Sequence, residues 1–432
     1  MPSLQHSIRH RGAEAFVDSG LPRWRSLLQE LVRTPSTFEH EHAVVKLVSN
    51  YLESLGIRVK RVPHRATSLN RLAGAQPPLS TVRNRSSLVA SVEGSGGGPS
   101  LAINTHLDTV PAGEPSGWTK PPFSGYIDPA TNVLYGRGAM DDKAGVVISL
   151  AVLETLVKAP VTLGGDVVFH YVLEDETTGN GTLLCLESGH TADAALILDG
   201  TRLDKAIGQH AGNLQFEVQV RGRPASVSVS HMGINAAEMA ARLVLELRDA
   251  FLALNAGRSE PWTRFPSPYQ LVVQQLHAVG SQLTVPESAS AQCYVTFPPP
   301  LDLAAIRQLL EDEVADFARR QRLPVPPELV WNGFATEPVC GQSPQLENLL
   351  QSTAAELGLP PIDVGPSTGT SDLRHFADRG IPCVLYGPGR GFNPHRPDEH
   401  YYLDDLPTMI RFYVRAAQTF CSSQHARRKR AA

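Results

Sequence analysis

Short apolar runs that alternate with helical segments place the strongest constraint on the fold of this chain. Between the runs lie segments with apolar residues at helical spacing, such as residues 145–157. Strands that are apolar along their whole length are typical of parallel sheets buried on both faces. We therefore predict an α/β fold in which helices cover a mostly parallel sheet. The five runs are residues 87–92, 101–105, 167–173, 194–198 and 382–386.

The pattern changes near Asn213, where apolar and polar residues begin to alternate. This period predicts an antiparallel strand with one solvated face. A helical segment, two strand-like segments and a second helical segment follow, which together indicate an inserted α+β domain. We expect three parts: residues 1–212 form the first part of the main domain, residues 213–333 the insert, and residues 334–432 the second part of the main domain, ending in a basic C-terminal tail.

Composition excludes several classes of partner. The 432 residues are 42% hydrophobic and 19% charged, and a net charge of −4 gives no reason to expect nucleic acid or an acidic membrane surface as a partner. No segment approaches the length of a membrane span, and residues 1–17 do not resemble a signal peptide. The five cysteines lie far apart, so we expect buried free thiols in a reducing cytoplasm.

Possible metal ligands follow several of the predicted strands. Open α/β sheets present their chemistry at the carboxyl ends of strands, so these side chains are expected to meet there. Two imidazoles and three carboxylates suit a pair of divalent ions such as zinc. Asp108, two residues after His106, is expected to accept the ring proton and so fix the tautomer that binds metal. The candidate ligands are His106, Asp141, Glu176, Asp199 and His395.

The content and order of these motifs resemble the M20 family of di-zinc aminoacyl hydrolases, which includes acetylornithine deacetylase, succinyl-diaminopimelate desuccinylase, aminoacylase and the glutamate carboxypeptidases. The most specific segment is Gly-Arg-Gly-Ala-Met-Asp-Asp-Lys at residues 136–143. The resemblance implies that Asp141 bridges two zinc ions, often with a cis peptide after it. It implies that His106 and Asp199 complete one site, and that Glu176 and His395 complete the other. Cobalt and manganese are the alternative metals.

The resemblance also implies the chemistry and the architecture. A bridged pair of ions lowers the pKa of a shared water and polarises an amide carbonyl, as amide hydrolysis requires. The main domain would then be a zinc-peptidase-like catalytic domain, and the insert a lid or dimerisation domain. Asp175 occupies the place of the glutamate that takes the proton from the water, but it is shorter by one methylene. Glu174 is a weaker alternative base, because adjacent residues in an extended chain point in opposite directions.

The substrate-binding positions match the family only in part. Ser226 occupies the place of a histidine that reaches the scissile carbonyl, and His231 is a substitute only if its loop is rearranged. Leu283 and Phe297 replace an asparagine and an arginine. Arg374 lies in a matching segment and is predicted to bind the free carboxylate of the substrate, with an ion pair inside the fold as the alternative.

These observations predict metal-dependent hydrolysis of an amide bond in an N-acyl amino acid or a small peptide-like substrate. A homodimer through the insert is a further expectation. Two alternatives remain because the base and carbonyl-binding positions are substituted. One is a metal-binding relative that has lost hydrolysis, and the other is an enzyme with altered chemistry, such as amide-bond formation.

Overall fold

A computed structural model describes residues 2–79, 84–391 and 393–422, which divide into two compact units. The larger unit contains the described residues up to Gly208, the segment Cys340–Gly365 and the described residues from Ser371 onwards. The smaller unit contains Gln209–Val339 and Pro366–Thr370. The predicted basic C-terminal tail lies outside the described residues.

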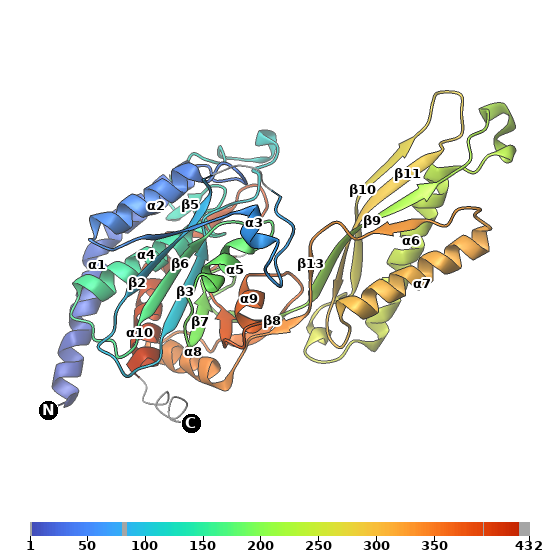
Figure 1. Cartoon of the computed structure of the whole chain (residues 1–432). Helices are drawn as coiled ribbons and strands as arrows, with labels where there is room; N and C mark the ends of the chain where they lie inside the picture. Colours follow the sequence, from blue (N-terminus) through green and yellow to red (C-terminus); the bar gives the residue numbers. More distant parts are fainter. Residues whose placement is uncertain (1, 80–83, 392, 423–432) are drawn as a thin grey trace. The chain divides into compact units, whose positions relative to one another are not determined.

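A mixed, mostly parallel sheet forms the centre of the larger unit (Figure 1). Its path among the described strands is β1-β2-β6-β3-β7-β16-β8-β14, and β15 pairs with β8. Strands β6, β3, β7 and β16 are mutually parallel neighbours. Strands β1 and β2 run antiparallel to the strands beside them, and β8 runs antiparallel to β16. The strand bounds are β1 Lys60–Pro63, β2 Ser86–Val92, β3 Leu101–His106, β6 Val167–Val172, β7 Ala194–Ile197, β8 Lys205–His210, β14 Val339–Cys340, β15 Asp363–Ser367 and β16 Cys383–Leu385.

Helices cover both faces of this sheet because its strands are apolar on both faces (Figure 1). Leu101 and Ile103 of β3 share one core with α1, α2, α4, α8 and α10. Val172 at the end of β6 belongs to a second core with α3 and α5. The helix bounds are α1 Pro2–Arg33, α2 His42–Ser54, α3 Ala66–Leu69, α4 Lys143–Lys158, α5 Asn180–Glu187, α8 Pro344–Glu356, α9 Leu373–Ala377 and α10 Leu406–Ser422.

A small antiparallel sheet connects distant parts of the larger unit. It has the order β17-β5-β4, with β17 His400–Tyr402 between the C-terminal loops and α10, β5 Val133–Tyr135 and β4 Tyr126–Asp128. Pairing of Tyr401 with Leu134 therefore fixes the loop before β17 against the segment that leads into α4. This unit also contains the 3-10 helices η1 Pro115–Gly117 and η5 Leu403–Asp405.

The smaller unit is an antiparallel sheet with two helices. The sheet has the order β10-β11-β9-β12, with β13 paired to β9, and α6 and α7 contribute to its apolar core. Asn235 caps the start of α6 and Asp302 caps the start of α7 with side-chain oxygens. The bounds are β9 Gly212–Arg221, η2 Val227–Met232, α6 Ala236–Leu254, η3 Asn255–Gly257, η4 Trp262–Arg264, β10 Gln270–Val279, β11 Ser288–Phe297, α7 Leu303–Gln321, β12 Glu328–Val330 and β13 Ala335–Thr336.

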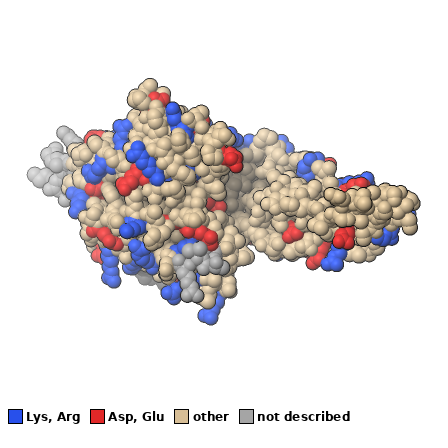
Figure 2. Space-filling model, turned by 90° about the horizontal axis from the view of Figure 1, so that it is seen from above, with Lys and Arg blue, Asp and Glu red and all other residues tan. Residues whose placement is uncertain are grey.

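The predicted fold class is confirmed: a mostly parallel, helix-covered sheet is accompanied by an α+β unit. The residue boundaries of the predicted domains stay a prediction. Acidic and basic side chains are interspersed over the visible face of the larger unit (Figure 2), in keeping with a small net charge. None of the described helices combines the length and apolar character that crossing a bilayer demands.

One expectation about the cysteines was wrong. Cys185, Cys293, Cys383 and Cys421 are buried free thiols, but Cys340 is exposed. The physical reason is its place in β14, a two-residue strand at the end of the path, which has a neighbouring strand on one side only among the described residues.

Candidate metal centre

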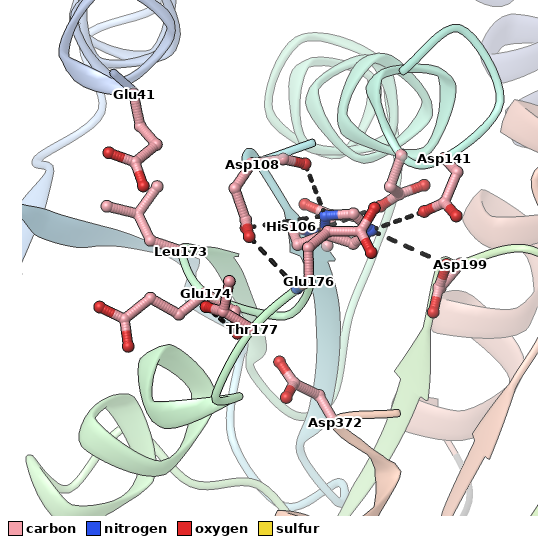
Figure 3. A network of polar contacts seen from close by, with 12 residues as sticks. Glu41, His106, Asp108, Asp141, Leu173, Glu174, Glu176, Thr177, Asp199 and Asp372 are labelled. Carbon is pink, nitrogen blue, oxygen red and sulfur yellow. Dashed lines mark hydrogen bonds and ion pairs between the residues drawn. The ribbon is translucent and has the colours of Figure 1, made fainter. Parts of the chain in front are cut away.

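Neighbouring parallel strands deliver most of the candidate ligands to one edge of the sheet. His106 is the last residue of β3, Glu176 follows β6, and Asp199 follows β7. His395 lies in the loop after β16, and Asp141 precedes α4. Because parallel strands have their carboxyl ends at the same edge, these five side chains meet there (Figure 3 labels four of them).

The orientation of His106 is fixed by its own chain. Its Nδ1 atom lies 2.9 Å from the backbone oxygen of Asp108. A carbonyl oxygen only accepts, so Nδ1 carries the proton and Nε2 is left to face the carboxylates. The side-chain oxygen of Asp108 is 3.7 Å from Nδ1. The backbone carbonyl of Asp108, and not its carboxylate as predicted, therefore makes the closer contact with this proton.

Asp141 stands between the two imidazoles. Its Oδ1 lies 2.9 Å from His106 Nε2, and its Oδ2 lies 3.3 Å from His395 Nε2. His395 Nε2 is also 2.9 Å from Glu176 Oε2, and His106 Nε2 is 3.8 Å from Asp199 Oδ1. Each imidazole thus faces a different oxygen of Asp141, and the division into two ligand sets stays a prediction. The peptide bond after Asp141 is cis.

These separations bracket the spacing of ligand atoms around one zinc ion. A tetrahedral zinc ion with ligand atoms about 2.0–2.2 Å away separates those atoms by roughly 3.3–3.6 Å. The contacts around His106 and His395 span 2.9 to 3.8 Å. Ligand atoms of His106, Asp141 and Glu176 also lie within 4.8 Å of one another, as do those of His106, Asp175 and Asp199. An unprotonated Nε2 beside a carboxylate oxygen is repulsive, so the geometry calls for a proton or a metal ion between them.

The electrostatics of the cluster lead to the same conclusion. Burial raises the pKa of Glu176 to about 8, and the charge of Asp141 acts in the same direction. Burial and Asp141 likewise raise the pKa of Asp199 to about 6. Burial would also raise the pKa of Asp141. The hydrogen bonds of Asp141 with His106 and His395 outweigh burial, so the pKa of Asp141 is lowered. Carboxyl groups that resist ionising together become stable anions when a divalent cation binds among them.

Two residues outside the predicted site, Arg137 and Glu399, hold Asp141 in place. Glu399 is fully buried, and its Oε1 accepts hydrogen bonds from the backbone N–H groups of Met140 at 3.0 Å and Asp141 at 3.1 Å. Its Oε2 accepts from Arg137 Nη1 at 2.6 Å. Glu399 lies four residues after His395 and therefore joins the two ligand-bearing loops. Arg137 lies inside the motif at residues 136–143, but spacing alone does not show that it pairs with Glu399.

Asp108 and Asp142 make further contacts around the ligands. Asp108 Oδ2 accepts from the backbone N–H of Glu176 at 3.2 Å, and Asp142 Oδ2 accepts from that of His106 at 3.3 Å. Burial raises the pKa of Asp108 to about 7, although His106 acts in the opposite direction. A side chain at Gly145 would collide with Asp142, since a Cβ there would lie 2.0 Å from Asp142 Oδ1. These contacts tie β3 to the two ligand loops.

The two acidic residues before Glu176 differ in their surroundings. Glu174 is buried, and its carboxylate contacts His64, Arg85 and Thr178. Burial would raise the pKa of Glu174, but these partners lower it to about 2. Asp175 is half-buried, and one of its oxygens lies in the ligand cluster. The accessible carboxylate beside the centre is therefore that of Asp175.

The predicted substrate-binding residues lie outside this cluster. Arg374 is 4% exposed, and its guanidinium donates to the backbone oxygens of Thr178 at 2.7 Å and Ser371 at 3.2 Å. These contacts favour a role inside the fold, so binding of a substrate carboxylate by Arg374 stays a prediction. His231 is exposed in η2, and Ser226 is exposed just before it, both in the smaller unit. The role of His231 also stays a prediction.

Known proteins resemble the chain over most of its length. Residues 102–419 match the peptidase family M20/M25/M40. A succinyl-diaminopimelate desuccinylase of Methylorubrum extorquens is 28% identical over 412 residues, which cover 91% of this chain and 98% of the relative.

Solved structures share the fold. The dipeptidase Dug1p of Saccharomyces cerevisiae superposes with a TM-score of 0.73 at 15% identity, covering 96% of this chain and 99% of that one. A dinuclear metal binding peptidase of the M20 family from Bacillus subtilis superposes with a TM-score of 0.65 at 16% identity, covering 94% and 99%. At these identities, the likeness concerns the fold alone.

Proposed function

We propose, from the premise that this chain belongs to the peptidase family M20/M25/M40 and is therefore an enzyme of the amidohydrolase and peptidase class, that it hydrolyses the amide bond of an N-acyl amino acid or a small peptide-like substrate. The family is metal-dependent, and we propose two zinc ions as the cofactors. The observation that carries the proposal is Asp141, whose two oxygens face two different imidazoles.

The residues of the centre divide into two sets. His106 and Asp199 would hold one ion with Asp141, and Glu176 and His395 would hold the other with Asp141. When bound, such a pair of ions lowers the pKa of water and polarises the amide carbonyl. The hydrogen bond from His106 Nδ1 to the backbone of Asp108 keeps Nε2 directed at its carboxylate partners.

Asp175 is the proposed proton-transfer residue. Its carboxylate lies beside the ligand atoms of His106 and Asp199, and it is more accessible than Glu174. It would take a proton from the attacking water and return it to the leaving nitrogen, as a general base and then a general acid. Glu174 is committed to other partners and is unsuited to this task.

The substrate class is supported by the names of the relatives. One relative is a desuccinylase, which acts on an acylated amino acid, and one structural neighbour is a dipeptidase. Both kinds of substrate carry an amide bond near a free carboxylate, and Arg374 remains the proposed partner of that carboxylate. We further propose a cytoplasmic location. The complete ligand set and the family membership favour hydrolysis over a protein without activity or an amide-forming enzyme.

A substrate screen tests the proposal. N-acetyl, N-formyl, N-succinyl and N-carbamoyl amino acids and a set of dipeptides are incubated with the protein, with and without zinc, cobalt or manganese. Release of free amine is expected from at least one of these classes and only when metal is present. No amine release from any of them by protein that carries two ions per chain would overturn the proposal.

We also propose that the smaller unit forms a homodimer. Strand β10 is the end strand of its sheet, and edge strands pair readily with other chains. Val272, Leu276 and Val279 on this strand are 49%, 47% and 62% exposed. Leu245 and Leu252 on α6, which packs beside β10, are 47% and 46% exposed. A second copy of the strand and helix would cover these apolar side chains.

Charge on β10 is expected to separate the dimer. Leu276→Lys places an ammonium group where the two strands would meet, and burying an unpaired charge is costly. Wild-type protein is expected to have the mass of two chains of 46.8 kDa, and the variant the mass of one. Light scattering after size-exclusion chromatography measures both masses. Leu79→Lys, at a position 62% exposed in the larger unit, is the control that keeps the dimer. A wild type with the mass of a single chain contradicts the proposal.

A further inference from the structure

We propose that Glu174, Arg85, Glu41 and His64 form a positioning network that holds the loop bearing Asp175 and Glu176 against the metal centre. None of these four residues is a proposed ligand. The inference rests on the proposed function, since Glu176 is one of the proposed ligands. It assigns to the four residues a role in metal affinity and in placing the proton-transfer group.

The backbone of Glu174 organises the loop. Its carbonyl oxygen accepts from the N–H groups of Thr178 at 2.9 Å, Gly179 at 2.5 Å and Thr177 at 3.2 Å. Its φ is 75°, in the left-handed region that residues other than glycine rarely adopt. The turn closes around Asp175 and Glu176, so the position of both carboxylates depends on the conformation of Glu174.

The side chain of Glu174 fixes that conformation. Its Oε1 accepts from Arg85 Nη1 and lies 3.1 Å from His64 Nδ1, and its Oε2 accepts from Thr178 Oγ1. The Glu174 carboxylate is 5% exposed, so these contacts operate away from bulk water, where hydrogen bonds to charged groups are strong. Thr178 belongs to the same turn, so its contact with Glu174 holds the turn closed. The contacts with Arg85 and His64 join the turn to two other segments of the chain.

Arg85 connects Glu174 to the segment between α1 and α2. Its Nη2 donates to Glu41 Oε1, and its Nε donates to Glu41 Oε2 at 3.3 Å, which makes this a two-point ion pair. Its guanidinium also lies 4.7 Å from the ring centre of Phe38. Arg85 therefore sits between two buried carboxylates, and both Glu41 and Glu174 depend on its charge.

His64 connects the loop to strand β2. Its Nε2 lies 2.9 Å from Ser87 Oγ, and that hydroxyl oxygen accepts from the backbone N–H of Leu173 at 3.2 Å. Leu173 is the residue before Glu174. The chain is thus held at two successive residues, at Leu173 through Ser87 and at Glu174 through His64.

Packing cannot replace these contacts on the outer side of the loop. A cavity of about 1080 Å³ lies there, and Glu41, His64, Arg85 and Leu173 are among the residues that line it. The described residues leave this space unfilled, so the hydrogen bonds and ion pairs of the network support the loop on this side.

Metal affinity in full-length variants tests the network. Glu174→Gln removes the charge that Arg85 and His64 contact, and Thr178→Val removes one hydroxyl donor with little change of shape. Residues that orient metal ligands typically change metal affinity about 10–100-fold. Zinc titration against a chelating indicator is expected to show one of the two ions bound about 10–100-fold more weakly in Glu174→Gln, with a smaller loss in Thr178→Val. Arg85→Lys is expected to bind zinc more tightly than Arg85→Met, because it keeps the charge.

Glu154→Gln is the matched control. Glu154 is a buried carboxylate of the same unit that accepts from Arg23, Trp24 and Tyr51 and contacts none of the proposed ligands. This variant is expected to lose thermal stability but to keep wild-type zinc affinity. Wild-type affinity in Glu174→Gln, or in Thr178→Val and Arg85→Met if Glu174→Gln does not fold, overturns the inference. A wild type that binds two ions but cleaves no substrate overturns the proposed function alone.

Discussion

Replacing Asp141 by asparagine is expected to abolish binding of the ion pair and to lower kcat/KM by at least about 10³-fold. Asparagine keeps one oxygen at this position and exchanges the other for an amide N–H₂ group. In the structure, one Asp141 oxygen faces His106 and the other faces His395. An amide group on one side is a donor, so it cannot coordinate a cation there. The two ions would also lose the negative charge that separates them.

The measurement combines metal analysis with kinetics on the best substrate of the screen. Asp193→Asn is the control, because Asp193 is an exposed carboxylate at the opposite end of strand β7 from Asp199. It is expected to keep two ions and full activity. An Asp141→Asn protein with two ions per chain and wild-type kcat/KM would show that Asp141 bridges nothing.

Replacing Asp175 by asparagine is expected to lower kcat by about 10²–10⁴-fold, the contribution typical of a well-placed proton-transfer group. Two zinc ions per chain are still expected, because Asp175 is not one of the five proposed ligands. The amide has nearly the shape of the carboxylate but cannot take a proton from water. The effect is measured on protein pre-loaded with zinc, as the initial rate on a single substrate over a range of pH.

Asp175→Glu separates two interpretations of the shorter side chain. If this enzyme is a slowed form of its family, the longer carboxylate is expected to raise kcat. If the centre is adapted to aspartate, glutamate is expected to lower it. An Asp175→Asn variant with unchanged kcat would assign proton transfer to another group, and Glu174→Gln would then be the next variant to assay.

The central strands could be predicted because they are buried on both faces. Residues 101–105 and 167–173 are apolar runs, and β3 and β6 lie within one residue of them. Other strands of the same sheet carry little signal. Strand β1 buries only Val62, and β14 has two residues, so neither stands out from a loop by composition. Their place in the sheet is decided by pairing with distant strands, which no local pattern records.

The ligand candidates could be proposed because each follows a strand-like run or lies in a specific motif. Their support could not be predicted. Arg137 and Glu399 lie 262 positions apart in the sequence, and their pairing depends on how β17 meets β5. The pairing of Arg85 with Glu174 could not be predicted either. In the sequence, Arg85 looks like any other charged residue, and only the fold brings it to Glu174. For Arg374, the motif predicted binding of a substrate carboxylate, with an ion pair inside the fold as the alternative. The fold places its guanidinium against two backbone carbonyls, and its role in substrate binding stays a prediction.

The larger unit consists of separate stretches of the chain, so the ribosome makes its parts at different times. When the ribosome has produced residues up to Gly208, four of the five proposed ligands exist, but β16 and the loop with His395 have not been synthesised. Strand β16 pairs in parallel with β7, so a nascent chain exposes that side of β7 until β16 has been synthesised. Of the two proposed ions, the one assigned to Glu176 and His395 would therefore gain its last ligand only when the loop after β16 has been made, and a chain truncated before that loop would lack this ligand.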